Sequence, residues 1–138
     1  MKSLTIISAA LLSAPMCMVA QAAMDATTQS VADRYIKNLN EMANIFETAT
    51  PANVDKSVQR MAMTAKELQS ASIAEKNLQP AQQQAMKSDP VLKAKLRAAM
   101  NHLARAKEIF KAKLQNVSPE ERDQLFKVVE IVTEVTKS

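Results

Sequence analysis

The chain has one histidine, His102, and histidine is the side chain most used for proton transfer and metal binding near neutral pH. A metal site needs several converging ligands, but the positions three and four residues from His102 on a helix hold no histidine or carboxylate. Ser-His-Asp and Cys-His sets lack evident members, and no pair of carboxylates lies on an apolar stripe where burial would shift its pKa. The sequence therefore predicts no metal site and no enzyme activity.

Methionine offers a second kind of chemistry, because its thioether can ligate haem iron together with a histidine. Met42 and Met61 lie on the apolar stripes of two expected helices, where methionine commonly fills gaps in a core. In one interpretation both methionines are core residues and His102 is a partly exposed residue on a helix flank. In the other, one of them pairs with His102 at a haem. His102, Met42 and Met61 are therefore the candidate cofactor-binding residues.

The 138 residues include no glycine, although average usage would supply about ten. Rossmann and P-loop nucleotide sites are excluded, because their fingerprints consist of glycines. Hairpins and sheets also rely on glycine in their turns. The abundant alanine, lysine, glutamine, methionine and leucine instead favour helices. The composition predicts an all-α fold.

Apolar residues recur at alternating spacings of three and four in four segments, the pattern of helices that bury one face. The first helix is expected from about residue 28 to residue 49. The others are expected to begin at the cap-plus-proline pairs Thr50-Pro51, Asp89-Pro90 and Ser118-Pro119. The four stripes are Tyr35, Leu39, Met42, Phe46 and Ala49; Val54, Val58, Met61, Ala65, Leu68 and Ser72; Leu92, Leu96, Ala99, Leu103, Ala106 and Phe110; and Leu125, Val128, Val132 and Val135.

Two of the three connections between these helices are very short, so consecutive helices are expected to be antiparallel neighbours. An antiparallel up-down-up-down four-helix bundle is the simplest arrangement that buries four such stripes. Residues 79–88 are polar and contain Pro80, which predicts one long connection with a short helical turn. Asn116 is expected to end the third helix in the left-handed conformation that glycine usually adopts.

The fourth helix is apolar beyond its stripe, because Phe126, Val129 and Ile131 flank the residues that face the core. One interpretation is tighter burial within the bundle. The other is a surface for a partner protein or for a second copy, so that the protein is either a monomer or a homodimer through this helix. The net charge of +4 is modest and aromatic side chains are few, so nucleic acid is not an expected partner.

The first 22 residues have the features of a cleaved signal peptide. Lys2 precedes a mostly apolar stretch over residues 4–19, and Ala20-Gln21-Ala22 matches a small-x-small cleavage site. We therefore expect residues 1–22 to be removed and residues 23–138 to form one exported, periplasmic domain. That domain contains no cysteine and therefore no disulfide, and no integral membrane segment is expected after cleavage.

Several segments carry a family resemblance: Lys37-Asn38-Leu39-Asn40-Glu41, Ile45-Phe46-Glu47, the turn over residues 49–54, and Arg60-Met61 with Ala65 and Gln69. In these segments the chain resembles the cytochrome b562 family of periplasmic haem proteins with up-down-up-down bundles. The resemblance implies a non-covalent b-type haem at one end of the bundle and one-electron transfer. It also implies iron ligands early in the first helix (methionine) and late in the fourth (histidine). Here Ile36 stands at the methionine position and Ser138 lies about where the histidine would fall, so those ligands are not matched.

Three functions follow as hypotheses. The first is a cytochrome b562-like protein that has lost haem ligation and serves as a binding or interaction protein in the periplasm. The second is a haem electron carrier with a rearranged ligand pair that includes His102. The third is a periplasmic chaperone, in which the basic face of the third helix and the apolar flank of the fourth hold unfolded proteins.

Overall fold

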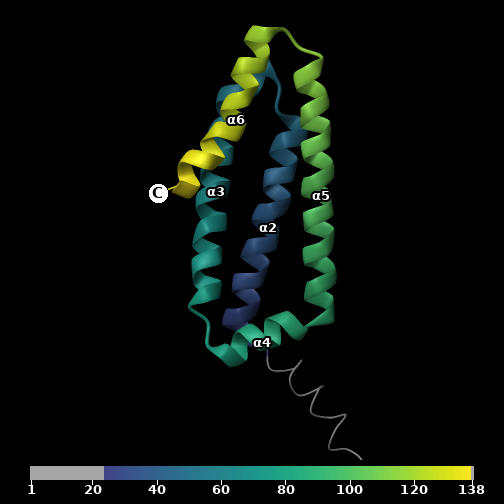
Figure 1. The fold of residues 1–138 in the computed structure, drawn as a ribbon. Coiled ribbons are helices and arrows are strands. Elements are labelled where there is room, and N and C mark those ends of the chain that lie inside the picture. Colours follow the sequence, from purple (N-terminus) through teal and green to yellow (C-terminus); the bar gives the residue numbers. More distant parts are fainter. Residues whose placement is uncertain (1–23, 138) are drawn as a thin grey trace, which may run out of the picture.

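Residues 24–137 are described by a computed structural model, and the expected signal peptide over residues 1–22 lies outside them. Helices account for nearly all of the described residues, which confirms the prediction of an all-α fold (Figure 1). Within this part of the chain, none of the helices combines the length and the apolar character needed to cross a membrane. In chain order the elements are α2 (Ala26–Thr48), the 3-10 turn η1 (Pro51–Asn53), α3 (Val54–Lys76), α4 (Pro80–Ser88), α5 (Pro90–Gln115) and α6 (Pro119–Lys137).

The starts of α5 and α6 confirm the caps predicted from the sequence. Asp89 Oδ1 accepts the backbone N–H groups of Val91 and Leu92, each at 2.9 Å. At α6, the N–H of Glu121 donates to Ser118 Oγ at 3.2 Å, and the N–H of Ser118 donates to Glu121 Oε1 at 3.1 Å. These bonds satisfy helix donors that otherwise have no partner, so both boundaries follow from local sequence.

The start of the second long helix differs from the prediction, because Pro51 begins a 3-10 turn and not an α-helix. The side chain of Asn53 accepts the N–H of Thr50 at 2.7 Å and donates to the carbonyl of Thr48 at 3.0 Å. These bonds close a tight turn, and the α-helix begins only at Val54. Here the proline marks the turn between two helices and not the first turn of α3.

Most of the connection expected over residues 79–88 is a nine-residue helix, α4. The N–H of Gln79 donates to Gln82 Oε1 at 2.8 Å, which closes a capping box at its start. Gln83 Nε2 donates to the carbonyl of Glu75 at 3.2 Å and so joins α4 to the end of α3. Glutamine is not among the preferred cap residues, which explains why the sequence signalled only a short helical turn.

The prediction of a left-handed Asn116 was wrong. Its φ is −104°, and no residue in the described part of the chain has positive φ. The backbone and side-chain N–H groups of Asn116 donate to the carbonyls of Lys113 and Ala112, each at 3.0 Å. Arg122 Nε donates to the carbonyl of Leu114 at 2.8 Å. Because these acceptors at the end of α5 are already paired, the left-handed cap is not needed.

α2 and α3 are antiparallel neighbours, as their short connection predicts. Arg34 lies in the first half of α2. Its Nη2 lies 3.7 Å from Glu67 Oε2 and donates to Ser70 Oγ at 3.1 Å. Glu41, later in α2, forms an ion pair with Arg60, which comes earlier in α3. Residues later in α2 therefore contact residues earlier in α3, as expected of an antiparallel pair.

α2 and α5 lie side by side and run in the same direction (Figure 1). His102 Nδ1 of α5 lies 2.9 Å from Asn40 Oδ1 of α2. Later in both helices, Lys113 Nζ donates to the carbonyl of Ala49 at 2.9 Å. Residues later in α5 contact residues later in α2, so the two helices are parallel. α5 packs more extensively against α2 than against α4 or α6, its neighbours in the chain.

α6 packs mainly against α3 and contacts α5 little, although the connection between α5 and α6 is short. Figure 1 shows the two helices diverging from their connection, with α6 ending beside the middle of α3. The expectation that consecutive long helices pack closely therefore holds for α2 and α3 and is wrong for α5 and α6. As a result, α6 does not extend over the half of α2 that lies nearest α4.

The main hydrophobic core lies in the other half of the bundle, where the four long helices meet. The rings of Phe46 and Phe110 are tilted at 60° with centroids 5.1 Å apart, a favourable aromatic geometry. Most predicted stripe residues are buried or half-buried, which confirms which face of each helix is inward. The buried members of this core are Met42, Ala43, Ile45, Phe46, Ala49, Val54, Met61, Ala106, Phe110, Leu125 and Val128.

The apolar flank of α6 is only partly buried. Ile131 packs against the core, whereas Phe126 is 40% exposed and Val129 is 38% exposed. Tighter burial within the bundle is therefore wrong for Phe126 and Val129. The alternative, a surface for a partner protein or a second copy, stays a prediction.

Candidate functional site

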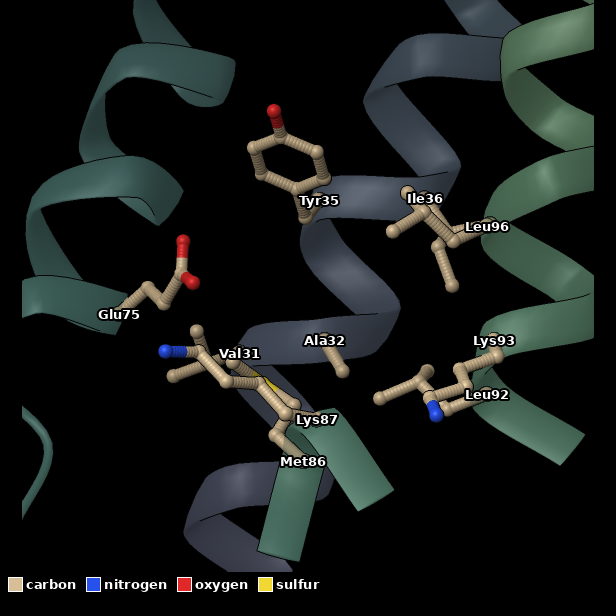
Figure 2. A pocket seen from close by; sticks show the side chains of 10 residues that line it. All are labelled: Val31, Ala32, Tyr35, Ile36, Glu75, Met86, Lys87, Leu92, Lys93 and Leu96. Carbon is tan, nitrogen blue, oxygen red and sulfur yellow. The ribbon is translucent and has the colours of Figure 1, made fainter. Parts of the chain in front are cut away.

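A pocket of about 330 Å³ lies at the end of the bundle that α4 closes (Figure 2). This volume is at the lower end of the range of small-molecule sites, which is about 300–1,000 Å³. Apolar side chains form most of its wall, and charged side chains stand at its edge. The lining residues are Val31, Ala32, Tyr35 and Ile36 of α2, Glu75 of α3, Met86 and Lys87 of α4, and Leu92, Lys93 and Leu96 of α5.

The pocket forms because α2 turns apolar residues toward a space that α6 does not reach. Val31 and Tyr35 are four residues apart, as are Ala32 and Ile36, so the two pairs form adjacent rows on one face of the helix. Ala32 has only a methyl group and therefore leaves room above the helix backbone. Val31 and Ala32 are buried, whereas Tyr35 and Ile36 are half-buried, so this wall of the pocket is more accessible at Tyr35 and Ile36.

The N-terminus of α2 helps to hold α4 in place. Asp25 caps α2 by accepting the N–H of Thr28 at 2.8 Å, and its second oxygen accepts Gln82 Nε2 of α4 at 2.9 Å. These hydrogen bonds lower the pKa of the Asp25 carboxyl below its ordinary value of 3.8, and the bond from the backbone N–H of Thr28 has the largest effect. The contact ties two segments that lie 57 residues apart in the sequence.

Buried side chains of α4 and α5 close the end of the pocket. Leu92 of α5 is 7% exposed and lines the pocket, and Ala85 of α4 is 3% exposed beside the lining residue Met86; both helices contact α2. Met86 follows Ala85 and projects into the pocket beside Val31 (Figure 2). Methionine is unbranched and adapts its shape readily, so this part of the wall is the most deformable.

Two lysines from different helices stand at the edge of the pocket. Figure 2 shows Lys87 of α4 on the side of Glu75, and Lys93 of α5 on the opposite side. Both lysines are exposed, and within residues 24–137 neither has an ion-pair partner within 4.0 Å. The edge therefore carries two positive charges against the one negative charge of Glu75.

The candidate residues Met42 and Met61 both lie in the main core and not in this pocket. Met42 is 6% exposed and Met61 is fully buried, and they belong to the same cluster of packed side chains. Their placement agrees with the interpretation of methionine as a core residue.

His102 links α5 to α2. Its Nδ1 lies 2.9 Å from Asn40 Oδ1, and its Nε2 lies 3.0 Å from Glu47 Oε1. The side chain is 25% exposed, which agrees with the expected position on a helix flank. Both ring nitrogens are therefore engaged in contacts between helices, and His102 does not line the pocket.

The described residues do not fit a haem held by His102 and either methionine. An axial pair must approach one iron from opposite sides, but both nitrogens of His102 already have partners on α2. Met42 follows Asn40 by two residues, which turns it about 200° around α2, away from the face that His102 contacts. Met61 is enclosed by the core.

Sequence reasoning missed the pocket, although it placed several of its residues on apolar stripes. Tyr35, Leu92 and Leu96 were expected to face the core, and the structure brings them together around a space left open. The contribution of Met86 and Lys87 depends on α4, for which Pro80 was the available signal. Among residues 24–137, no group of three or more His, Cys, Asp or Glu side chains is arranged to hold a metal ion.

Comparisons with protein-family models, with curated proteins and with solved structures find no match. Residues 24–137 form an all-α helical bundle with antiparallel contacts.

Proposed function

We propose that this protein is exported to the periplasm and binds an apolar small molecule, without converting it, in the pocket between α2, α4 and α5. The observation that carries the proposal is a concave, mostly apolar wall with a few polar groups at its edge. That arrangement is typical of small-molecule binding sites. An apolar ligand would gain free energy by leaving water, at roughly 25 cal/mol for each Å² of apolar surface buried.

The resemblance of the first two long helices to the cytochrome b562 family supports a binding protein that lacks the haem. Ile36, which stands at the position of the family's methionine ligand, lines this pocket. An isoleucine side chain cannot ligate iron, yet it contributes apolar surface. We infer that this end of the bundle keeps a binding space but takes a different ligand.

The direct test is binding of a neutral naphthylamine probe whose fluorescence rises in apolar surroundings. We expect saturable binding by the purified protein and a loss of affinity of at least about tenfold, or 1.4 kcal/mol, in Leu96→Trp. The reason is that the indole is larger than the leucine side chain and fills the pocket from α5.

Met100→Trp is the matched control, because Met100 lies one turn further along α5, is 58% exposed and does not line the pocket. The natural chain has no tryptophan, so each indole also reports its own surroundings. Emission should be shifted to shorter wavelength in Leu96→Trp relative to Met100→Trp. Equal probe affinity in the wild type and in Leu96→Trp would overturn the proposal.

Haemin is the second probe, because it separates this function from electron transfer. We expect no low-spin b-type absorption spectrum when haemin is added to the purified protein. If such a spectrum appeared and His102→Ala abolished it, the haem electron carrier with a rearranged ligand pair would replace the proposal.

A periplasmic chaperone is a second candidate, and the exposed part of the α6 flank favours it. Phe126 and Val129 offer apolar contacts for unfolded protein at exposures of 40% and 38%. We expect Phe126→Ser with Val129→Ser to reduce any suppression of aggregation of a model substrate, while leaving probe binding in the pocket unchanged. A wild-type protein that does not slow aggregation at all would exclude this candidate.

A further inference from the structure

We propose that the ligand of the pocket is a single-chain amphiphile with an anionic head group, such as a fatty-acid carboxylate. The proposal rests on the proposed function, because it needs the pocket to be a binding site. It adds the charge and the shape of the ligand.

The charges at the edge of the pocket select the sign of the head group. Lys87 and Lys93 are exposed, carry positive charge at neutral pH and have no ion-pair partner within 4.0 Å in the described chain. Glu75 is the one acidic residue among the lining residues. A ligand anion would therefore meet a net positive edge, whereas a ligand cation would be repelled.

The position of the lysines places the head group at the edge of the pocket near α4. They come from two helices and stand on opposite sides of the wall (Figure 2). A lysine can lay its methylene chain along apolar surface and keep its ammonium group in water. Either ammonium could thus meet a carboxylate at the edge without being buried, which avoids the cost of removing a charge from water.

The interior of the pocket selects an apolar chain. Val31 and Leu92 are buried, Ile36 and Leu96 are half-buried, and all four apolar side chains line the pocket. Apart from the Tyr35 hydroxyl, the side chains of α2 that line it have no polar atom. A sugar or a nucleotide would leave its hydrogen-bonding groups unpaired against this wall, which is unfavourable. A flexible hydrocarbon chain has no such groups.

The test compares ligands that share one chain and differ in head group: dodecanoate, dodecanol and dodecyltrimethylammonium, each below its micelle concentration. Affinity is measured by displacement of the neutral naphthylamine probe. We expect dodecanoate to bind about tenfold more tightly than the cation. In Lys87→Gln with Lys93→Gln, the affinity for dodecanoate should fall about fivefold, because exposed ion pairs contribute modestly. The same variant should bind the neutral probe and dodecanol as the wild type does.

Lys95→Gln is the matched control, because Lys95 is an exposed lysine of α5 that does not line the pocket. Its affinity for dodecanoate should equal that of the wild type. Raised salt should weaken dodecanoate binding and leave dodecanol binding unchanged. Equal affinities for the anionic and cationic ligands would overturn this inference while leaving the proposed function intact. Failure of Leu96→Trp to reduce probe binding would instead overturn the proposed function.

A membrane lipid is the other source of the same head-group chemistry, and vesicles of anionic phospholipid distinguish it. We expect free dodecanoate to displace the naphthylamine probe from the pocket. We also expect vesicles to bind the Leu96→Trp variant as well as they bind the wild type. If vesicle binding were lost in Leu96→Trp and dodecanoate did not displace the probe, the inference of a free amphiphile would be wrong.

Discussion

Replacing Leu125 with alanine is expected to lower the free energy of unfolding by about 2–5 kcal/mol. Leu125 is fully buried and belongs to the core in which α6 meets the other long helices. The shortened side chain removes apolar contacts and leaves a cavity that a close-packed core closes only in part. Urea unfolding followed by circular dichroism measures the change.

Phe126→Ala is the matched control for this prediction. Phe126 is the next residue of α6, and its side chain is 40% exposed, so truncation removes less buried surface. We expect it to cost about 1 kcal/mol or less, within the range of partly exposed sites. If both substitutions cost the same, α6 would not be docked through the face that contains Leu125.

Replacing Lys113 with methionine is expected to lower the free energy of unfolding by about 1–2 kcal/mol. Lys113 Nζ donates to three carbonyls at the end of α2: that of Phe46 at 3.3 Å, that of Ala49 at 2.9 Å and that of Glu47. The last carbonyls of a helix have no partner within it, so the ammonium group completes α2. Methionine keeps the length of the side chain and removes the donors.

Lys111→Met is the control, because Lys111 is exposed and pairs only with Glu108 on its own helix, at 3.3 Å. An exposed pair of this kind contributes little, so the substitution should change stability by less than about 0.5 kcal/mol. A loss as large as that in Lys113→Met would show that the contact between Lys113 and α2 is not what stabilises the fold.

The stability contributed by Lys113 should also depend on pH. Burial lowers the pKa of Lys113 below its ordinary value of 10.5, and the charge of Glu47 opposes this effect only in part. Between the folded value and 10.5 the unfolded chain binds more protons, so the free energy of unfolding rises as pH increases through this window. The difference in stability between the wild type and Lys113→Met should therefore grow as pH approaches 10.5. A difference that shrinks with pH would contradict this assignment.

Local features of the fold could be predicted because they depend on residues close together in the sequence. The capping box of Ser118 and Glu121 spans four positions, and Asp89 accepts N–H groups only two and three residues further along the chain. The inward faces of the long helices follow from the spacing of apolar residues. Where a nearby side chain competes, the prediction fails, as it does at Asn116 and at the 3-10 turn after Thr50.

The candidate site was harder to predict, because its parts are distant in the sequence. Tyr35 and Leu96 were correctly placed on apolar stripes, but a stripe does not tell whether another helix covers it. His102 meets Asn40 and Glu47 across 62 and 55 positions. No local sequence pattern predicts such a contact, because the contact depends on how α5 is aligned with α2.

Local sequence patterns are sufficient to specify that this chain is all-α, where most of its long helices begin, and which side of each helix is apolar. These properties arise from backbone geometry, from cap hydrogen bonds and from helical periodicity, all of which act within a few residues. The parallel direction of α2 and α5 follows from the predicted up-down-up-down order, but the packing of α2 against α5, the packing of α6 against α3 and the pocket near α4 emerge from the tertiary structure alone. Those outcomes depend on which apolar helix faces pack together. Because each helix could pack against more than one other helix, the arrangement depends on the packing of the entire chain.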